Sequence, residues 1–472
     1  MDSLVNQAAP QRVLVMAHGH PDFSLGGGEL AAYNLFKALR EDTTVEQAWF
    51  IARHDSGNGP TGAFTLRREN EYLWQQSLGD SFLIKAANSY AVWNDFRQLI
   101  RTLKPTVVNL HHYFHLGIEL LRIIKEEDPS IRVVLTLHEY MAICHQQGQM
   151  VKRGSNKLCF RASIEDCHRC FPEFSKEQFW LRRSFIGQHF DYVDHFVSPS
   201  HFLKQRYVEW GLPEDKISVI ENGQSPEPKL TPRQLPESEI EEEEIDGDEY
   251  TEAALQKAVA AMTVGGQRPL TRKVTKNGKT VYIVEKSKQP TRNRLAFFGQ
   301  INPFKGIDIL MHAMLSMTRK ERDALVVEIH GANFEHQAGE FKDSIMQMAN
   351  TLIAEGSLRW VGSYEPFQVR ERMRNVDWVI IPSIWWENSP MVIQEAFVCG
   401  RPVIASDIGG MEEKISNGVD GLHFEARNPL SLAQVLKKAA SMANDEWLTF
   451  HENIQAPLTY KESAEEYQKI FI

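Results

Sequence analysis

The chain has 472 residues, of which 42% are hydrophobic and 10% aromatic, and its formal net charge is −10. That length exceeds what one hydrophobic core usually holds, so we expect two domains. Much of the excess negative charge lies in one run, 237–249, so no general affinity for nucleic acid is expected.

Two features of the sequence bear on the compartment. No continuous apolar stretch is long enough to cross a bilayer. The first residues lack the basic and apolar regions of a signal peptide. We therefore expect a cytoplasmic protein.

The first predicted elements are a buried strand and a glycine-rich loop. Val13–Ala17 is apolar throughout, and the run that contains Gly27 and Gly28 leads from it into a helix. Glycines at such a place let the backbone approach a ligand closely, although a tight turn without a ligand is their commoner meaning. No Gly-Lys-Ser/Thr follows, which argues against a loop that binds nucleoside triphosphates.

Two further predicted strands end in histidine. Residues 107–110 precede His111, and residues 133–137 precede His138. Parallel strands end at the same edge of a sheet, so we expect both imidazoles at its mouth. A single histidine at a strand end is nevertheless more often structural than catalytic.

Four of the five cysteines follow His138 closely: Cys144, Cys159, Cys167 and Cys170. The last two have the Cys-x2-Cys spacing of metal ligands. A structural tetrahedral zinc site, with His145 or His168 in place of one thiol, and four free thiols are the two interpretations. A disulfide is the weaker one in a reducing cytoplasm. Cys399 is expected in the core of a helix.

Residues 179–183 combine aromatic and basic side chains on a predicted helix. Such a helix either contacts a lipid-linked acceptor at a membrane surface or packs its apolar face while Arg182 and Arg183 stay in water. We favour packing. The first domain is expected to end near Gly223.

Residues 224–292 depart from the compact pattern. They contain a Pro-rich entry, the acidic run 237–249, which we expect to be mobile, and a predicted helix over 251–262. The pair Asn277-Gly278 between two β-prone stretches predicts a hairpin. This basic hairpin has three candidate partners: another protein, a membrane, or the acidic run itself.

A second sheet is predicted from strands that alternate with helices. The strands cover 295–299, 325–329, 359–361, 378–381 and 401–406, and an amphipathic helix covers 307–317. Lys305 follows the first of these strands, where its charge would neutralise a diphosphate. A solvated loop lysine is the alternative.

The stretch from Glu387 to Glu395 joins a buried strand to a capped helix. Asn388 or Ser389 is the expected N-cap, Pro390 the first helical residue, and Gly400 the end. The helix N-terminus would favour a phosphate, and the two carboxylates would accept hydrogen bonds from sugar diols. An ordinary surface loop before a core helix is the alternative.

The Glu-x7-Glu spacing, with Gly409 and Gly410 downstream, resembles family 4 of the retaining nucleotide-sugar glycosyltransferases. The resemblance implies an α/β GT-B fold, in which two Rossmann-like domains face each other across a cleft. It places an acceptor-side domain with the Cys-rich loop at 1–223, the linker and insertion at 224–292, the nucleotide-sugar domain at 293–455, and a terminal helix that returns to the first domain at 456–472.

The resemblance also implies roles for individual residues. The catalytic set is His138, Lys305 and Glu387, and His111 lies on the acceptor side. The donor-binding set is Gly27, Gly28, Gln300, Lys305, Gly331, Val361, Glu387, Asn388, Ser389, Pro390, Met391, Val392 and Glu395. Three positions depart from the family pattern: Gln300 stands where an arginine is usual, Ala332-Asn333 replaces Asp-Gly, and Asn109 often has a histidine counterpart.

The activity implied is transfer of a sugar from a nucleotide-diphosphate donor to a glycan or lipid-linked acceptor, in surface polysaccharide or glycoconjugate synthesis. The chemistry would need no metal, and the enzyme would work in the cytoplasm or at the inner face of the membrane. Two alternatives remain open. One is a non-catalytic sugar-nucleotide-binding subunit, motivated by Gln300, whose insertion holds a protein partner. The other is a GT-B epimerase or phosphorylase.

Overall fold

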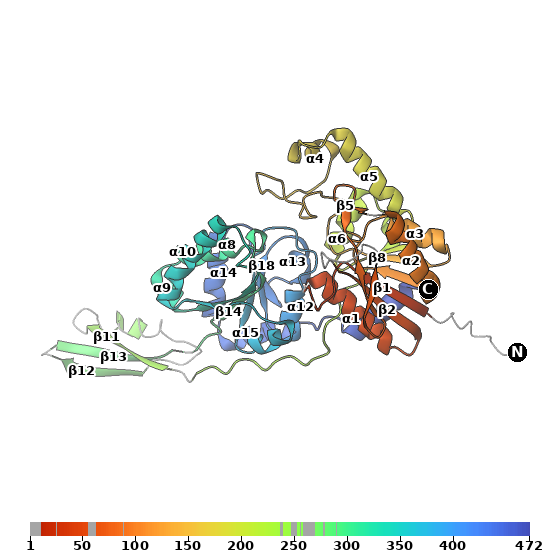
Figure 1. Cartoon of the computed structure of the whole chain (residues 1–472). Coiled ribbons are helices and arrows are strands. Elements are labelled where there is room, and N and C mark those ends of the chain that lie inside the picture. Colours follow the sequence, from red (N-terminus) through yellow and green to blue (C-terminus); the bar gives the residue numbers. More distant parts are fainter. Residues whose placement is uncertain are drawn as a thin grey trace.

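Two parallel sheets, each covered by helices on both faces, form the two domains of the computed structural model (Figure 1). The structure describes residues 11–24, 26–54, 63–87, 89–236, 239–246, 253–254, 256–257, 270–276, 279–288 and 290–472. No helix of this described part is both long and apolar enough to cross a membrane.

The first sheet has eight strands in the order β10-β9-β8-β7-β1-β2-β4-β3, and all neighbours are parallel except β3 and β4. The strands are β1 (Gln11–Ala17), β2 (Val45–His54), β3 (Phe64–Arg68), β4 (Glu71–Gln75), β7 (Val107–Leu110), β8 (Arg132–Thr136), β9 (His195–Ser198) and β10 (Ile217–Val219). The short strands β5 (Leu78–Asp80) and β6 (Lys85–Ala86) pair separately. The helices of the first domain are α1 (Gly27–Glu41), α2 (Ser89–Leu103), α3 (Leu120–Glu127), α4 (Ile164–Cys170), α5 (Lys176–Phe190) and α6 (His201–Trp210).

The second sheet has six parallel strands in the order β16-β15-β14-β17-β18-β19. They are β14 (Arg294–Gln300), β15 (Val326–Ala332), β16 (Leu358–Trp360), β17 (Trp378–Ile381), β18 (Val403–Ser406) and β19 (Gly421–Phe424). The helices of the second domain are α8 (Ile307–Ser316), α9 (Arg319–Asp323), α10 (Gly339–Glu355), α11 (Val369–Met373), α12 (Met391–Val398), α13 (Gly409–Lys414), α14 (Pro429–Ser441) and α15 (Asn444–Asn453). The last helix, α16 (Tyr460–Ile470), lies against the first domain. Three short 3-10 turns, η1 (Glu214–Lys216), η2 (Pro303–Lys305) and η3 (Pro366–Gln368), lie in loops.

Strands buried on both faces explain why the apolar runs predict them well. In β1, Leu14 and Met16 belong to the core on one face, while Val13, Val15 and Ala17 belong to the core on the other. The second sheet repeats this alternation in β14. Parallel sheets covered by helices need such continuous apolar strands.

The strand order reverses once in each sheet, between β1 and β7 and between β14 and β17. Open α/β sheets bind their ligands at such a reversal, beyond the carboxyl ends of the strands. Gly27 and His111 follow the first pair of strands, and Lys305 and Glu387 follow the second. The topology therefore positions the predicted site residues at two switch points.

The chain crosses between the domains twice, and the two crossings run side by side. The backbone N–H of Gln224 donates to Leu458 O at 2.8 Å, and that of Tyr460 donates to Gln224 O at 2.9 Å. After the second crossing, α16 packs on the first sheet beside α1, where Tyr467 and Phe471 are buried.

The insertion forms a three-stranded antiparallel sheet that extends away from the second domain (Figure 1). Its strands are β11 (Glu239–Asp246), β12 (Leu270–Lys276) and β13 (Lys279–Lys288), and β13 is central. Residues 239–246 of the acidic run, which we expected to be mobile, therefore form a paired strand, because the basic hairpin offers them a complementary edge. Residues 277–278 and most of the helix predicted over 251–262 lie outside the described residues.

Helix α5 corrects our expectation for Arg182. Its side chain is buried and donates to three backbone carbonyls, those of Phe82, Ala142 and Met141, at 2.5–2.8 Å. Arg183 is exposed, as expected, and donates to Trp210 O. A buried guanidinium has five donors, and two of its three acceptors, Met141 O and Ala142 O, belong to the loop that begins the Cys-rich segment. Arg182 therefore fastens α5 to that loop.

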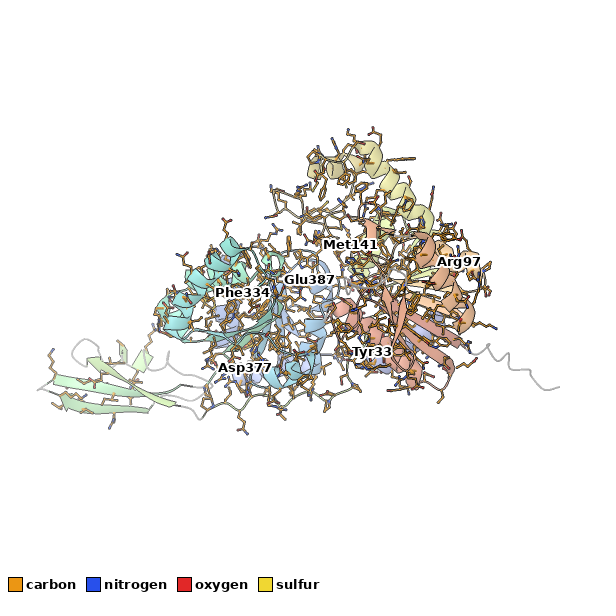
Figure 2. All side chains as sticks on the ribbon, viewed as in Figure 1. Tyr33, Arg97, Met141, Phe334, Asp377 and Glu387 are labelled. Atoms are coloured by element: carbon orange, nitrogen blue, oxygen red, sulfur yellow. The ribbon has the colours of Figure 1, made fainter. Side chains whose placement is uncertain are left out.

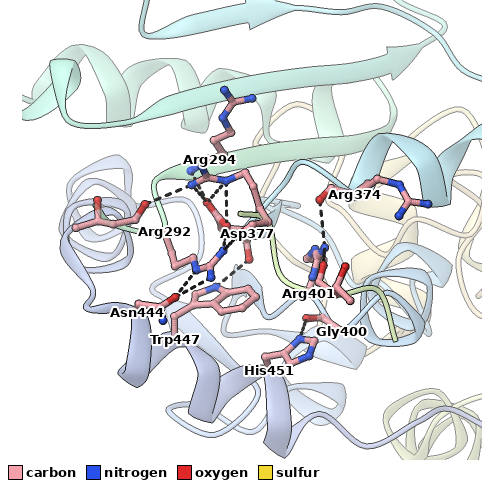
Figure 3. A network of polar contacts seen from close by, with 12 residues as sticks. Arg292, Arg294, Arg374, Asp377, Gly400, Arg401, Asn444, Trp447 and His451 are labelled. Carbon is pink, nitrogen blue, oxygen red and sulfur yellow. Dashed lines mark hydrogen bonds and ion pairs between the residues drawn. The ribbon is translucent and has the colours of Figure 1, made fainter. Parts of the chain in front are cut away.

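A buried ion-pair network joins the linker to the second domain (Figure 3). Asp377 is fully buried, and its carboxylate accepts hydrogen bonds from Arg233 at 2.7 Å and from Arg292 at 3.3 Å. The backbone N–H of Arg294 donates to it as well. Arg292 also donates to Asn444 and stacks over Trp447.

We predict that Asp377→Ala destabilises the second domain by about 3–5 kcal/mol, because Arg292 and Arg233 lose the carboxylate that compensates their burial. Thermal unfolding followed by circular dichroism measures this. Asp323→Ala is the matched control: its carboxylate is half exposed and pairs with Arg319 on one helix turn, so it should cost at most about 0.5 kcal/mol. Equal effects of the two substitutions would contradict a stabilising role for the network.

Candidate functional site

The loop between β17 and α12 carries the first of the two glutamates on the side of the second domain that faces the first (Figure 2). Pro390 is the N-cap residue of α12 and Met391 its first helical residue, one position later than expected. No side chain caps this helix. The oxygens Asn388 Oδ1 and Ser389 Oγ, which we expected as caps, are buried without a hydrogen-bond partner.

Glu387 is buried and densely hydrogen bonded. Its Oε1 accepts from Lys305 Nζ at 2.6 Å, from Ser383 Oγ at 2.7 Å and from Trp385 Nε1 at 2.8 Å. A carboxylate out of water needs such donors, since an unpaired buried charge is costly. The sequence predicted Glu387 and Lys305 separately but gave no signal for Ser383 and Trp385.

Two glycines allow this arrangement. A Cβ on Gly306 would lie 1.8 Å from Pro382 O, and one on Gly410 would lie 1.9 Å from Asn388 O. The Gly410 N–H also donates to Glu387 O at 2.7 Å. Only residues without a side chain let the loops after β14 and β18 approach the loop after β17 so closely.

Glu395 lies one turn into α12 and is partly exposed. Its carboxyl is nevertheless surrounded by protein atoms that exclude water, and this desolvation raises its pKa to about 7. Its charge contributes to the raised pKa of Tyr364 and of Tyr460, after burial of each phenol. Glu395 therefore titrates near neutral pH.

The ends of β14, β15 and β16 place the other predicted donor-side residues along one edge of the sheet. Gln300 ends β14 and is exposed, Val361 follows β16 and is 45% exposed, and the N–H of Gly331 donates to Gly362 O at 3.0 Å. Sequence reasoning missed the pair beside them: Arg372 bonds His330 Nδ1 at 3.2 Å.

Five histidines of the first domain form a cluster of ring contacts: His18, His111, His112, His115 and His138. Burial is the largest cause that lowers the pKa of His138, to about 4, so its imidazole is neutral at pH 7. Its Nε2 bonds His111 Nδ1 at 2.9 Å. His111 is buried, and its other nitrogen bonds Asn109 Oδ1, so it orients His138 through a chain of hydrogen bonds.

Glu29 in α1 fixes the glycine-rich loop and was missed by sequence reasoning. Its Oε1 contacts His18 Nε2 at 3.1 Å and accepts from Ser24 Oγ at 2.6 Å. Burial alone would raise its pKa, but His18 and Ser24 lower it to about 2. His18, Glu29 and His112 offer ligand atoms that all lie within 4.8 Å of one another, close enough to hold a cation. Among the described residues they are the single such group of three or more His, Cys, Asp or Glu side chains.

The two walls meet at the start of α12. A Cβ on Gly27 would lie 3.3 Å from Met391 Sδ, and one on Gly28 would lie 2.5 Å from His112. Asn388 Nδ2 donates to His138 O at 2.6 Å. Gly27 and His138 of the first domain therefore meet Met391 and Asn388 of the second across one cleft, and Val392 lies in the same first turn of α12.

A cavity of about 560 Å³ lies beside this cleft. Phe304, next to Lys305, contributes one wall, and the first domain contributes the rest. The lining is aromatic and amide-rich: Phe114, Phe171 and Phe304 with Gln146, Gln147 and Gln149. Aromatic faces and amides are suited to a polyhydroxylated ligand.

The four clustered cysteines line a single smaller cavity, but of the two interpretations of these thiols the zinc site is not supported. Their thiols are free and do not form a group with ligand atoms within 4.8 Å of one another. Burial is the main cause that raises the pKa of Cys144 to about 11 and of Cys167 to about 12, so both thiols are protonated at neutral pH.

Two family models match the chain and cover both domains. Residues 25–227 match "Glycosyltransferase Family 4", and residues 279–448 match "Glycosyl transferases group 1". D-inositol 3-phosphate glycosyltransferase of Frankia alni is 29% identical over 147 residues, which are 30% of this chain and 36% of that protein. The enzyme of the same name from Geodermatophilus obscurus is 31% identical over 146 residues, which are 30% of this chain and 32% of that protein. The match thus spans about a third of these relatives.

Solved structures resemble the whole chain. Anabaena HepE in complex with UDP and glucose aligns with a TM-score of 0.58 at 16% identity, covering 98% of this chain and 99% of that one. Sucrose-phosphate synthase from Thermosynechococcus elongatus aligns with a TM-score of 0.60 at 13% identity, covering 98% of both chains. At these identities the likeness concerns the fold. With both domains matched, the chain belongs to the family 4 glycosyltransferases and has their GT-B fold of two Rossmann-like domains.

Proposed function

We propose that the protein is a retaining glycosyltransferase that uses a nucleotide-diphosphate sugar and a glycan or lipid-linked acceptor. The observation that carries the proposal is the meeting of three features at one point. Lys305 and Glu387 form a partly buried ion pair, the N-cap residue of α12 makes no capping hydrogen bond with its side chain, and Asn388 Oδ1 and Ser389 Oγ are buried without partners among the described residues. Buried polar atoms are nearly always paired, so these atoms favour a polar ligand.

The diphosphate fits the α12 N-terminus. The first backbone N–H groups of a helix have no partner within it, and the helix dipole favours an anion there. Lys305 adds a positive charge from the loop after β14. The solved HepE complex contains UDP, which agrees with a nucleotide diphosphate in this fold.

The reaction that these groups support is attack on the face from which the diphosphate leaves. The acceptor hydroxyl oxygen bonds the anomeric carbon while the bond between that carbon and the diphosphate oxygen breaks, and the hydroxyl proton passes to a phosphate oxygen. Lys305 and the α12 N–H groups stabilise the negative charge on the leaving diphosphate. Glu387 and neutral His138 hold sugar hydroxyls, and Glu395 holds the ribose.

The acceptor belongs in the 560 Å³ cavity next to Phe304. Its aromatic and amide lining favours a sugar over a purely apolar molecule. The curated relatives are named for inositol phosphate acceptors, and Arg153 in the lining is the cation that would meet such a phosphate. No step of this mechanism uses a metal ion.

Thermal-shift measurements with UDP-, GDP-, ADP- and dTDP-sugars test the proposal, because a true donor stabilises the folded state by mass action. We expect one base to raise the melting temperature, and that donor to be turned over with chelator present. Binding without turnover for any acceptor would instead favour a non-catalytic subunit, which the Gln300 position motivates. Release of free epimerised or phosphorylated sugar would favour the other alternative.

We predict that Lys305→Ala lowers kcat by about 100-fold or more, because the leaving group loses its cation. Donor turnover and thermal stability are measured together. Lys320→Ala in α9 is the matched control and should change neither. Normal turnover by the folded Lys305→Ala protein would reject the assignment.

We predict that donor binding weakens as the pH falls below about 7, where Glu395 takes up a proton and can no longer accept two hydroxyl hydrogen bonds. The raised pKa also means that the folded state holds this proton more tightly than the unfolded state. The free energy of unfolding therefore falls as the pH rises from about 4.5 to about 7.

Glu395→Gln separates these effects. The amide should weaken donor binding at pH 8 while making the protein more stable there than the wild type, and both pH profiles should flatten between pH 5 and about 7. Isothermal titration with the donor and thermal unfolding across this range measure them. Unchanged affinity at pH 8 would remove Glu395 from the donor site.

A further inference from the structure

Trp386 belongs to the second domain by sequence but to the core of the first by contact. It directly precedes Glu387, yet its side chain is only 5% exposed and lies in the largest hydrophobic cluster of the first domain. Its ring packs against Phe160 with centroids 5.1 Å apart and against Phe202 at 5.2 Å. Its Nε1 donates to Cys159 O at 3.2 Å.

The residue on the other side of Glu387 is also tied to the first domain. Asn388 Nδ2 donates to His138 O at 2.6 Å. Among the described residues, the Glu387 side chain makes its hydrogen bonds to Lys305, Ser383 and Trp385 of its own domain. Consecutive Cα atoms are about 3.8 Å apart, so anchoring both neighbours restricts where the Glu387 backbone can lie.

A second contact supports the same closed arrangement nearby. The carboxylate of Glu413 in α13 accepts from the backbone N–H groups of His201 and Phe202 at 2.8 Å and 2.6 Å. These N–H groups open helix α6, where a negative charge is favourable. Phe202 therefore presents its ring to Trp386 while its backbone is held by the second domain.

A buried tryptophan with a satisfied N–H at the centre of a contact is the kind of residue that dominates an interface. Phe160 of the Cys-rich loop and Phe202 of α6 form the pocket that receives Trp386. The loop that contains Trp386 also carries Glu387. The same Cys-rich segment supplies His145 and Arg153 to the large cavity. One segment thus contacts both the cavity and the neighbour of Glu387.

We propose that Trp386 is a positioning residue, whose docking between Phe160, Phe202 and Cys159 O sets the orientation of Glu387 when the two domains are closed. The effect on catalysis rests on the proposed function of Glu387. The docking itself does not, because it is a contact between domains of the ligand-free protein.

A double-mutant cycle tests the proposal with Trp386→Ala, Phe202→Ala and the double variant. The substrate is whichever of UDP-, GDP-, ADP- and dTDP-glucose the wild type turns over fastest. We expect each single substitution to lower kcat/KM at least about tenfold. The kcat/KM of the double variant should be no more than about threefold below that of the worse single variant, since both substitutions remove the same contact between Trp386 and Phe202. Losses that simply multiply would overturn the proposal.

Two further variants exclude a general loss of folding. Trp386→Phe keeps a six-membered ring for the contacts with Phe160 and Phe202 but loses the five-membered ring with its N–H, so it should recover most of the kcat/KM that Trp386→Ala loses. Trp180→Ala removes an exposed tryptophan of α5 and should leave kcat/KM unchanged. A Trp386→Phe protein as impaired as Trp386→Ala would refute positioning through ring packing.

Small-angle scattering of the ligand-free proteins reads the docking without any reaction. The radius of gyration of Trp386→Ala should exceed that of the wild type and of Trp180→Ala, because the cleft loses a contact that closes it. If the radius of gyration of Trp386→Ala exceeds that of the wild type but the wild type transfers no sugar, the proposed function fails and the docking stands. If the radius is unchanged and kcat/KM is unchanged, the docking is refuted.

Discussion

The candidate site depends on the close packing of three loops at the carboxyl ends of β14, β17 and β18. Gly306 and Gly410 permit this packing, because a side chain on either would overlap a backbone carbonyl of the loop between them. The consequence is that Lys305 and Glu387, 82 positions apart, form a 2.6 Å ion pair. Desolvation makes an unpaired carboxylate costly there, and the three donors on Glu387 Oε1 satisfy and orient it.

The charges on the two walls of the cleft are unequal, and the inequality indicates where an anion would bind. The second domain contributes Lys305 and the uncapped start of α12. The first domain contributes imidazoles that burial keeps neutral, and its ionised Glu29 is occupied by His18 and Ser24. A diphosphate is therefore favoured against α12, and neutral hydroxyls against His138.

The sequence predicts most of what depends on local pattern. The apolar runs give β7 and β17 with the bounds observed and β1 within two residues, because strands buried on both faces must be continuously apolar. The pairing of the hairpin with the acidic run was one of three open alternatives. What the sequence could not give depends on contacts between distant segments. Ser383, Trp385 and Glu29 carry no motif, and Arg182 reads as a surface cation until its carbonyl acceptors are seen.

The two crossings of the chain limit how the cleft can open. Gln224 is hydrogen bonded in both directions to the segment that leads into α16, and a Cβ on Gly223 would lie 2.7 Å from Tyr460 Cα, so the two crossings touch. A relative motion of the domains that keeps these bonds must pivot about this pair of segments. The contacts of Trp386 and Glu413 are noncovalent and carry no chain across the cleft, so they can separate while the crossings stay intact. The loop that holds Glu387 thus lies where opening and closing of the cleft would alter its surroundings.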